Sequence, residues 1–503
     1  MEAETARPAR RGGDPVSGVH STPHPVDPLA VVRPQVRGFA IDHRKVARGD
    51  VFGAFQGEKV NGEDFIAEAI ARGAVAVVAR PEAVVEGALH VASSEPRRTF
   101  AVLAAGFFAP FPDTCVAVTG TNGKTSTTEI LRQLWQRAGF SAASMGTLGI
   151  TTGREGEIVD ASGMTTPDIV TFLSSVAGLQ REGVSHLAFE ASSHGLAQYR
   201  TEGLPVRAAG FTNLSRDHLD YHNDMESYFR AKLRLFSEVL DADGTAVVWR
   251  DHAAPGAEYA DRMLAVAEAR GLRLFSVGPD GDTVRLLART PTASGQILHL
   301  LLDDIAFGEM EIELPLIGGY QAANALVAAG LAMATGLSPA ATLRALERVQ
   351  GVRGRLERAV VTKTGASVYV DYAHTPDGLE SAIDALRPHT SARLILVFGC
   401  GGDRDRGKRP EMGAIAVRDA DIAIVTDDNP RGEDAAAIRA EILGSAPGAI
   451  EVADRRAAIG QALAMAKAGD TVLLAGKGHE QGQIIGQDVH PFDDVQVARE
   501  QAV

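Results

Sequence analysis

The residues best suited to chemistry in this sequence form a short glycine loop, Gly120-Thr121-Asn122-Gly123-Lys124-Thr125. An apolar run over 115–118 precedes the loop and predicts a buried strand, and apolar positions at helical spacing predict a helix over about 129–135. In such a unit, backbone N–H groups and the helix N-terminus face an anion, Lys124 adds a positive charge, and the Thr125 hydroxyl can bind Mg²⁺. Position 118 is Val, so the first glycine of a complete Walker A motif is missing. We interpret the loop as a phosphate cradle, with a simple turn as the alternative.

Other ligand-type side chains follow further predicted strands. Glu190 ends an apolar run over 186–189, where its carboxylate could hold Mg²⁺ opposite Thr125 or merely cap a surface loop. The segment 212–222 gathers two His, two Asp and an Arg after another apolar strand. Lys232 lies beside the apolar stripe of a helix predicted over 226–240, and its residue type and position alone indicate only a lysine with its stem on the core and its head group in water.

The elements that must position these residues alternate between strands and helices, which predicts an α/β fold with a mainly parallel sheet. We expect a disordered tail over 1–35, then a small N-terminal α/β domain over 36–112 with a helix at 64–72 and a strand at 74–79. A central domain over 113–348 and a C-terminal domain over 349–503 follow. The strands predicted in these two domains are 115–119, 186–191, 207–213, 244–249, 297–303, 367–372, 393–398, 422–426 and 471–475.

Composition narrows the class of protein. The 503 residues carry a net charge of -14, which argues against nucleic acid as a main partner. The chain shows neither a secretory signal nor an apolar run long enough to span a membrane, so we expect no membrane insertion. Its two cysteines, Cys115 and Cys400, lie in apolar runs and are expected to be buried and free, as in a reducing cytoplasm.

Taken together, the motifs resemble those of the Mur ligases, the ATP-dependent amide-forming enzymes of peptidoglycan synthesis, and most of all the members that add the third residue of the stem peptide. The resemblance covers about 38–495. It rests on the phosphate loop and on further blocks at 165–168, 190–195, 213–222, 354–355, 371–376, 398–405, 428–431 and 476–480.

The resemblance implies three domains: a UDP-sugar-binding N-terminal domain, a P-loop-type ATPase domain and a Rossmann-like C-terminal domain. It implies that ATP converts the D-Glu carboxylate of UDP-MurNAc-L-Ala-D-Glu to an acyl phosphate, which the amine of an incoming amino acid attacks, giving ADP and phosphate. The implied catalytic residues are Lys124, Glu190, His218 and Lys232. Thr125, Glu190, His218 and Lys232 would hold Mg²⁺, the last as a CO₂-derived carbamate (N6-carboxylysine). We expect a cytoplasmic monomer.

The resemblance also implies the binding residues. ATP would contact Gly120, Thr121, Asn122, Gly123, Lys124, Thr125, Ser126, Asn324, Arg355 and Asp371. The UDP-MurNAc-dipeptide would contact Ile41, His43, Thr165, Thr166, Ser192, Gln198 and Arg200. The amino acid would contact Arg404, Asp428, Asn429, Pro430, Arg431, Gly476 and Glu480.

The amino acid implied is meso-diaminopimelate, which differs from lysine by a distal carboxylate. A guanidinium binds a carboxylate through two parallel hydrogen bonds, so Arg431 would select the diacid. An L-lysine-adding ligase, a different Mur-type or folylpolyglutamate-type ligase, a phosphotransferase and a non-catalytic relative are the alternatives.

Three departures from the family pattern affect these expectations. His43 stands where the family usually has Ser, which puts a serine contact to the uridine in doubt. Arg353 stands where Pro is common, which would loosen the hinge before the C-terminal domain. Glu58-Lys59-Val60 is an unusual sequence near the sugar site.

Overall fold

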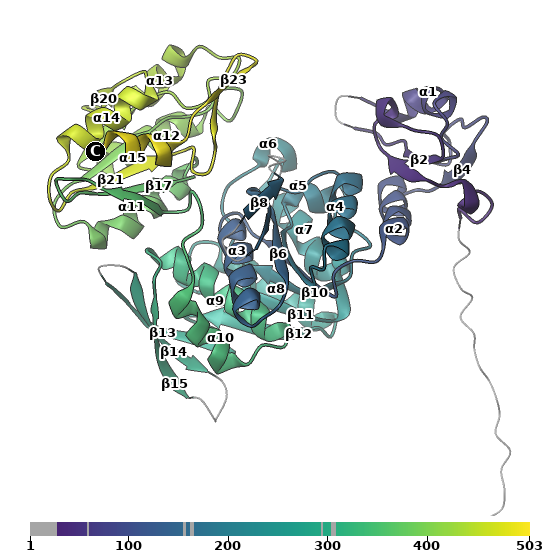
Figure 1. Cartoon of the computed structure of the whole chain (residues 1–503), viewed down its shortest axis with the longest axis horizontal. Coiled ribbons are helices and arrows are strands. Elements are labelled where there is room, and N and C mark those ends of the chain that lie inside the picture. The colour runs from purple at the N-terminus through teal and green to yellow at the C-terminus, as the bar shows by residue number, and fades with distance from the viewer. Residues whose placement is uncertain are drawn as a thin grey trace, which may run out of the picture. The chain divides into compact units, whose positions relative to one another are not determined.

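The computed structural model of the chain describes residues 28–57, 60–153, 157–160, 165–292, 295–302 and 308–502 (Figure 1). The chain separates into two compact units that divide between Pro96 and Arg97. Helix α2 (Pro96–Phe108) therefore belongs almost wholly to the second unit, where Arg98 pairs with Glu202 at 3.1 Å. The first unit thus ends before the domain boundary at 112 that the sequence predicts.

The first unit is a small parallel sheet with short helices. Its strands follow the order β1-β2-β3-β4, and every neighbouring pair is parallel. Its elements are η1 (Arg33–Gln35), β1 (Gly38–Ala40), η2 (His43–Lys45), β2 (Asp50–Gly53), η3 (Gly62–Phe65), α1 (Ile66–Ala71), β3 (Ala76–Ala79) and β4 (Leu89–Ala92). The predicted tail is wrong at its end, because residues 28–35 form turns and η1 and bury Leu29. The rest of that tail, 1–27, lies outside the described residues.

The second unit begins with a large sheet that follows the order β15-β14-β13-β12-β11-β10-β5-β9-β6-β7-β8 in the described residues. The strands from β13 to β6 in this order pair in parallel, and antiparallel strands extend both edges. The bounds are β5 (Thr114–Thr119), β6 (Ala142–Gly146), β7 (Gly149–Thr152), β8 (Glu157–Asp160), β9 (His186–Glu190), β10 (Val206–Phe211), β11 (Leu240–Trp249), β12 (Arg273–Gly278), β13 (Val284–Pro291), β14 (Gln296–Leu302) and β15 (Glu309–Leu314).

The strands at the centre of this sheet are apolar and buried because helices cover both of its faces. The helices are α3 (Lys124–Arg137), α4 (Ile169–Arg181), α5 (Ser193–Ala197), α6 (Leu219–His222), α7 (Met225–Arg234), the π-helix η4 (Leu235–Val239), α8 (Ala257–Ala269), α9 (Gly319–Ala334), α10 (Pro339–Ala345) and η5 (Leu346–Arg348). The register places Glu190 beside Val118 and Phe211 beside Thr119. The phosphate loop, Glu190 and the loop after β10 therefore share one edge.

The C-terminal part of the second unit is a doubly wound sheet of order β16-β17-β21-β18-β19-β20. One core lies under α11, α12 and α13, and another under α14 and α15. The strands are β16 (Glu357–Val361), β17 (Ser367–Asp371), β18 (Leu394–Phe398), β19 (Ile422–Val425), β20 (Ile450–Glu451) and β21 (Thr471–Ala475), with a separate hairpin of β22 (Gly482–Ile485) and β23 (Asp488–Pro491). The helices are α11 (Pro376–Leu386), η6 (Arg387–His389), α12 (Lys408–Asp419), α13 (Ala435–Leu443), α14 (Arg455–Met465) and α15 (Asp494–Gln501).

The sequence predictions of fold are largely confirmed. Each strand predicted in the central and C-terminal domains is present, and Cys115 and Cys400 are buried and free. The helix predicted over 226–240 is wrong in its last turn, since η4 replaces the α-helix and β11 begins at Leu240. Within the described ranges, every helix is too short or too polar to cross a bilayer.

Candidate active site

The phosphate loop turns sharply between β5 and α3. Gly120 and Gly123 have φ of 152° and 87°, which non-glycine residues rarely adopt. A Cβ on Gly123 would lie 2.2 Å from Asn324 Oδ1, and one on Gly120 would lie 1.9 Å from Thr212 Oγ1. The glycines therefore allow Asn324 and Thr212 to pack directly against the loop.

Two lysines share one acceptor beneath this loop. Lys124 Nζ donates to the Gly120 carbonyl at 2.9 Å and to the Thr121 carbonyl at 2.7 Å. Lys232 Nζ, from α7, donates to the same Gly120 carbonyl at 2.7 Å. Lys232 is 1% exposed, so the interpretation that its head group reaches water is wrong. Its amine instead contacts the backbone of the phosphate loop.

Burial changes the ionisation of both amines. Desolvation lowers the pKa of Lys124, and the carboxylates of Glu190 and Asp217 partly oppose this effect. The pKa of Lys232 lies well below its usual range because of desolvation first and the nearby Lys124 charge second. Lys232 therefore favours the neutral amine, which is the form that reacts with CO₂.

Tyr228 supports Lys232 from one helical turn earlier, and sequence reasoning missed it. Its hydroxyl lies 3.1 Å from Thr121 Oγ1, and Lys232 Nζ lies 4.5 Å from its ring centroid. The signal was present in the sequence, since residues at i and i+4 share a helix face.

Glu190 points into the site from the end of β9. It is 2% exposed, which excludes a surface-capping role. Its Oε1 accepts from the Thr147 N–H at 2.8 Å and its Oε2 from the Thr147 hydroxyl at 3.1 Å. A Cβ on Gly146 would lie 2.1 Å from Oε1, so glycine is required there.

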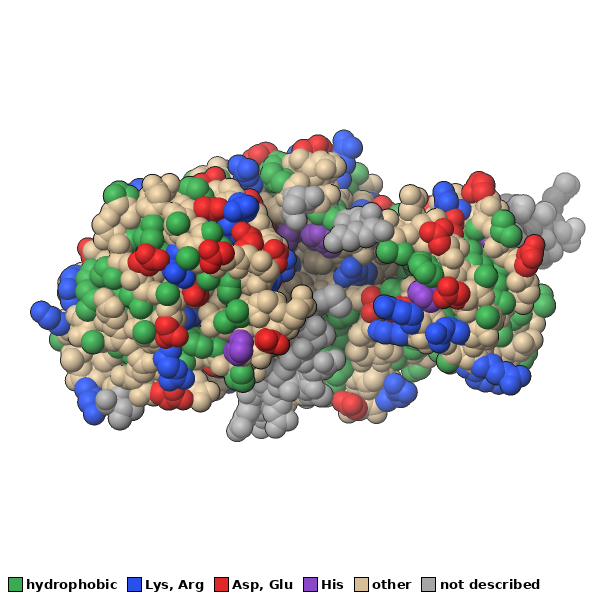
Figure 2. Space-filling model, turned by 90° about the horizontal axis from the view of Figure 1, so that it is seen from above, with side chains coloured by type: hydrophobic (Ala, Val, Ile, Leu, Met, Phe, Trp, Pro, Cys, Tyr) green, Lys and Arg blue, Asp and Glu red, His purple; other side chains and the backbone are tan. Residues whose placement is uncertain are grey.

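A cavity of about 790 Å³ lies beside the phosphate loop and Glu190. Its lining includes the phosphate loop with Ser126, Glu190, His218, Asn324, and Arg355 and Asp371 from the C-terminal part. His218 has a φ of 54°, and desolvation lowers the pKa of its imidazole, so the neutral, ligand-competent form is favoured. Figure 2 shows histidine side chains gathered at a hollow on one face of the molecule.

The donors around this cavity fit Mg²⁺ under one condition. Among the described residues, no group of three or more His, Cys, Asp or Glu side chains could hold a metal ion. Thr125, Glu190 and His218 line the cavity, but the nearby Lys124 and Lys232 amines are not anionic ligands. A carbamate on Lys232 would supply the missing anion.

Arg355 and Asp371 bring the C-terminal part to the cavity. Arg355 Nη2 donates to Thr125 Oγ1 at 3.2 Å, and its guanidinium lies 4.6 Å from the Tyr372 ring centroid. Asp371 accepts from the backbone N–H groups of Leu356 at 2.7 Å and Ala373 at 2.8 Å. Burial nevertheless raises the pKa of Asp371 to about 6.

The residues expected to hold the peptide end form one chain of hydrogen bonds. Arg200 donates to the Thr166 carbonyl at 2.6 Å and to Gln198 Oε1 at 2.7 Å. Gln198 Nε2 donates in turn to the Tyr221 hydroxyl at 3.1 Å. Ser192 N donates to Thr166 Oγ1 at 3.1 Å, and the Thr165 hydroxyl lies 3.0 Å from that of Thr147. The sequence analysis did not single out Tyr221.

His43 and Ile41 lie in the first unit. The His43 ring stacks on Phe65 with centroids 4.2 Å apart, and its Nε2 lies 3.5 Å from Glu68 Oε2. The ring is thus held by its own unit, and Ile41 is exposed beside it in sequence. Glu58 and Lys59, flagged as unusual, lie outside the described residues.

The expected amino-acid residues meet at the carboxyl ends of β18, β19 and β21. Lys477, which sequence reasoning missed, is fully buried; its Nζ donates to Asn429 Oδ1 at 3.0 Å and Glu480 Oε2 at 3.2 Å. Asn429 Nδ2 donates to the same Glu480 oxygen at 2.8 Å. Asp428 Oδ2 is buried and has no hydrogen-bond partner among the described residues. A Cβ on Gly476 would lie 2.7 Å from that oxygen.

Two arginines flank this group. Arg431 has a φ of 52°, and its Nη1 donates to the Gly402 carbonyl at 3.0 Å. Arg404 is exposed, and its Nη1 donates to the carbonyl of its neighbour Asp403 at 2.9 Å. The structure therefore brings Arg431, Asp428 and Glu480 to one edge of the sheet, with Arg404 on the adjacent loop.

The hinge differs from the sequence expectation. Arg353 Nη2 donates to Asp493 Oδ2 at 2.6 Å, which ties the residue to the start of α15. The expectation of a loosened hinge is therefore wrong, because an ion pair restrains this segment where proline would stiffen it. Three residues before Arg353, the backbone of Gln350 is bound to α3. The Gln133 side chain accepts from the Gln350 N–H at 2.7 Å and donates to the Gln350 carbonyl at 3.2 Å.

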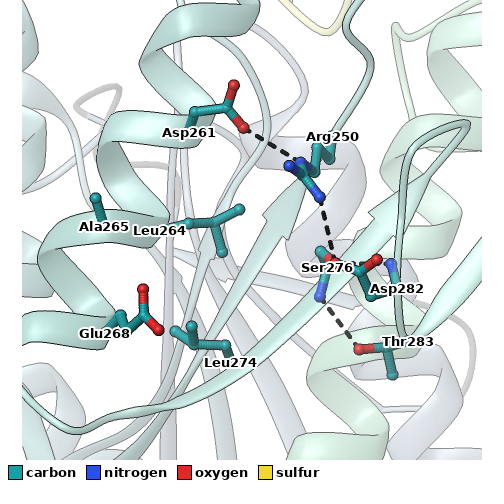
Figure 3. Close-up of a pocket in the computed structure, with 9 residues that line it drawn as sticks. All are labelled: Arg250, Asp261, Leu264, Ala265, Glu268, Leu274, Ser276, Asp282 and Thr283. Atoms are coloured by element: carbon teal, nitrogen blue, oxygen red, sulfur yellow. Dashed lines mark hydrogen bonds and ion pairs between the residues drawn. The ribbon is translucent and has the colours of Figure 1, made fainter.

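A second cavity, of about 350 Å³, lies between α8 and β12 (Figure 3). Arg250 bonds Asp261 at 3.2 Å and Asp282 at 3.3 Å across it. Ser276 Oγ accepts from the Asp282 N–H at 2.8 Å. These polar groups satisfy one another, so we assign the cavity no ligand.

The fold and the cavity define a nucleotide-binding enzyme with a phosphate loop at the end of a central parallel strand. Three family models match the chain: the Mur ligase middle domain over 118–332, the Mur ligase glutamate ligase domain over 354–478, and the Mur ligase family catalytic domain over 35–105. The chain belongs to the Mur ligase family, whose members are ATP-dependent, amide-forming enzymes.

Two relatives and a solved structure are similar over nearly the whole chain. The UDP-N-acetylmuramoyl-L-alanyl-D-glutamate--2,6-diaminopimelate ligase of Zymomonas mobilis is 57% identical, covering 92% of this chain and 94% of the relative. The protein of the same name from Caulobacter vibrioides is 50% identical, covering 95% and 97%. A solved structure of a ligase of that name is 33% identical with a TM-score of 0.67, covering 93% and 94%.

Proposed function

We propose that this chain is the ATP-dependent ligase that joins meso-2,6-diaminopimelate to UDP-N-acetylmuramoyl-L-alanyl-D-glutamate during peptidoglycan precursor synthesis. The single observation that carries the choice of amino acid is that Arg431 and a buried Asp428 oxygen, which has no hydrogen-bond partner among the described residues, lie on the same loop after β19. The guanidinium suits a carboxylate and the Asp428 oxygen suits an ammonium. The high identity to ligases of that name supports the same conclusion.

The first half of the reaction activates an acid. The γ-phosphoryl group of ATP moves to the D-Glu side-chain carboxylate, ADP leaves, and an acyl phosphate results. Lys124, Arg355 and the loop N–H groups would offset the charge that gathers on the transferring phosphoryl group. Asn324 would contact the adenosine, and Asp371 would hold the ribose side of the nucleotide.

Mg²⁺ would be held by Thr125, Glu190, His218 and the Lys232 carbamate. Bound there, it would neutralise phosphate charge. The chain's own contribution is a neutral Lys232 amine, which attacks CO₂ and releases one proton to give the carbamate. Its burial and the adjacent Lys124 charge favour that neutral form.

The second half joins the amine. The neutral amine of diaminopimelate attacks the acyl carbon, forms the amide bond and expels phosphate, while the proton leaves to solvent or phosphate. Arg431 and Arg404 would bind the carboxylates of the amino acid. Asn429 and Lys477 both donate to Oε2 of Glu480. Its Oε1 would therefore accept from the distal amine, together with Asp428.

The substrate's nucleotide end is assigned to the N-terminal domain, at Ile41 and His43. Its peptide end is assigned to Thr165, Thr166, Ser192, Gln198 and Arg200. We assign 36–112, 113–348 and 349–503 to the UDP-sugar, ATP and amino-acid domains. The buried, free cysteines support a cytoplasmic location, and we treat the protein as a monomer.

The test is phosphate release from ATP with UDP-MurNAc-L-Ala-D-Glu and one amino acid at a time. We expect sustained release, and the tripeptide product by mass spectrometry, with meso-diaminopimelate only. Sustained release without amino acid would contradict the ligase proposal. Equal product from L-lysine would contradict the specificity.

A further inference from the structure

We propose that Glu433 and Arg409 are positioning residues that set the selectivity for the amino acid by clamping together the two loops that carry Arg404 and Arg431. The inference rests on the proposed function of those arginines. Neither Glu433 nor Arg409 is among the residues assigned above to bind a substrate.

Arg409 is the fixed centre of the clamp. It lies on α12 and is fully buried, yet it carries a charge. Its Nη2 donates to Glu433 Oε1 at 2.8 Å, and its Nη1 donates to Glu433 Oε2 at 3.1 Å and to Glu441 Oε2 at 2.8 Å. A buried guanidinium that binds both oxygens of one carboxylate fixes that carboxylate in position and orientation.

Glu433 transmits this fixed position to the loop of Arg404. Its Oε1 also accepts from the Asp403 N–H at 2.6 Å. Asp403 has a φ of 53°, a conformation that needs support from its surroundings. The Arg409 hydrogen bonds hold the pKa of Glu433 at about 2, so the carboxylate stays charged at every working pH. Arg404 directly follows Asp403, so its backbone starts from this anchored residue.

A reciprocal bond closes the clamp. Asp403 Oδ2 accepts from the Gly432 N–H at 3.0 Å, next to Arg431. Gly402 N donates to the Asn429 carbonyl at 2.9 Å, and Arg431 Nη1 donates to the Gly402 carbonyl. The loop 401–404 is therefore bound to the loop 429–433 on both sides of Arg431.

The two loops leave no room for adjustment. A Cβ on Gly402 would lie 1.9 Å from the Pro430 carbonyl, and one on Gly401 would lie 2.7 Å from Arg431 Nη1. Because the backbones meet directly, a shift of either loop moves both arginines. Selectivity for a second carboxylate depends on that spacing, whereas ATP binding uses other loops.

Glu433→Gln tests the clamp. The substitution keeps the side-chain shape and an oxygen that can accept from the Asp403 N–H, but it removes the negative charge that pairs with Arg409. We expect KM for meso-diaminopimelate to rise about tenfold. The preference over L-lysine should fall by a similar factor, with KM for ATP and for the UDP-linked substrate unchanged. Glu441→Gln is the matched control, because it removes another carboxylate from Arg409 without touching the loop 401–404, and we expect less than a twofold change.

The outcomes separate this inference from the proposed function. If the unmodified protein fails to use meso-diaminopimelate, the proposed function fails. If it uses the amino acid but Glu433→Gln behaves like Glu441→Gln, the clamp is refuted. An equal loss of kcat with meso-diaminopimelate and with L-lysine, without a change in the preference between them, would show a merely structural role and would also refute the clamp. Should Glu433→Gln not fold, Asp403→Gly removes the bond from Gly432 at an exposed residue whose φ suits glycine, and the same selective rise in KM is expected.

Discussion

Replacing Arg431 with lysine tests how the amino-acid site recognises the distal carboxylate. The backbone of Arg431 is held by the hairpin that follows, since its N–H donates to the Ile484 carbonyl at 3.0 Å and its carbonyl accepts from the Gly486 N–H at 2.8 Å. These bonds do not involve the side chain. The exchange therefore keeps the charge and the main chain and changes only the head group.

The magnitude follows from the hydrogen bonds that a lysine cannot make. A guanidinium presents two parallel donors to a carboxylate, whereas an ammonium is a point charge. Losing one charge-assisted hydrogen bond costs about 1.5–3 kcal/mol, or about ten- to a hundredfold in kcat/KM. Arg431 Nη1 also donates to the Gly402 and Asn429 carbonyls at 3.0 Å and 3.4 Å. Lysine would lose part of this bracing, so we expect the upper half of that range.

The assay compares kcat/KM for meso-diaminopimelate and for L-lysine at saturating ATP and UDP-linked substrate. Arg431→Lys should lose rate with the diacid and little or none with L-lysine, while KM for ATP stays constant. Arg418→Lys is the matched control, because Arg418 is an exposed residue of α12 that pairs with Glu380 and Asp419. An unchanged ratio of the two amino acids in Arg431→Lys would refute recognition through the guanidinium.

Three further predictions concern the candidate active site. Lys232→Ala should abolish phosphate release through loss of the carbamate. Added bicarbonate should not restore the activity, whereas short carboxylic acids should. A rate of phosphate release near that of the unmodified protein would contradict the role. Tyr221→Phe removes one hydroxyl from Gln198, so KM for UDP-MurNAc-L-Ala-D-Glu should rise several-fold with KM for ATP unchanged; a KM within error of the parent protein refutes it. The pKa of Asp371, raised from 3.8 to about 6, means that the folded state holds a proton the unfolded state has lost, so ionisation should lower the free energy of unfolding by about 3 kcal/mol as pH rises from about 4 to about 6. Urea unfolding across that pH window should show a loss of the free energy of unfolding that Asp371→Asn lacks. An equal dependence of this free energy on pH in the two proteins would count against the prediction.

Local patterns in the sequence were enough for the central edge of the site. The apolar run 115–118 and the glycine loop predicted β5 and the start of α3, and parallel strands bring their carboxyl ends to one edge. Glu190 lies there because β9 pairs with β5 in a register that aligns it with Val118. Strands and glycine loops are encoded by residues that are close together in the sequence, so they could be predicted without knowledge of the fold.

Residues that act through distant contacts could not be placed in this way. Lys232 has the spacing of a core-edge lysine, and only the packing of α7 under the loop brings it to the Gly120 carbonyl, 112 positions away in sequence. Arg353 looked like a weakened hinge because its partner Asp493 lies 140 positions further on. The same holds for Arg409 and Glu433, which sequence reasoning left out because their ion pair joins positions 24 residues apart and depends on how α12 packs beside the loop after β19.

The shared Gly120 carbonyl also helps to explain why the pKa of one buried lysine is lowered. Two ammonium groups on one oxygen repel each other, and burial removes the water that would screen them. Loss of a proton from Lys232 relieves this repulsion and gives the nucleophile that CO₂ requires. The proposed carbamate would go further, because it would replace repulsion between the two side chains by attraction and place an anion beside Lys124. The arrangement that lowers the pKa of Lys232 would thus also stabilise the proposed carbamate, so one set of contacts would favour both the reactive form of the lysine and the product of its reaction.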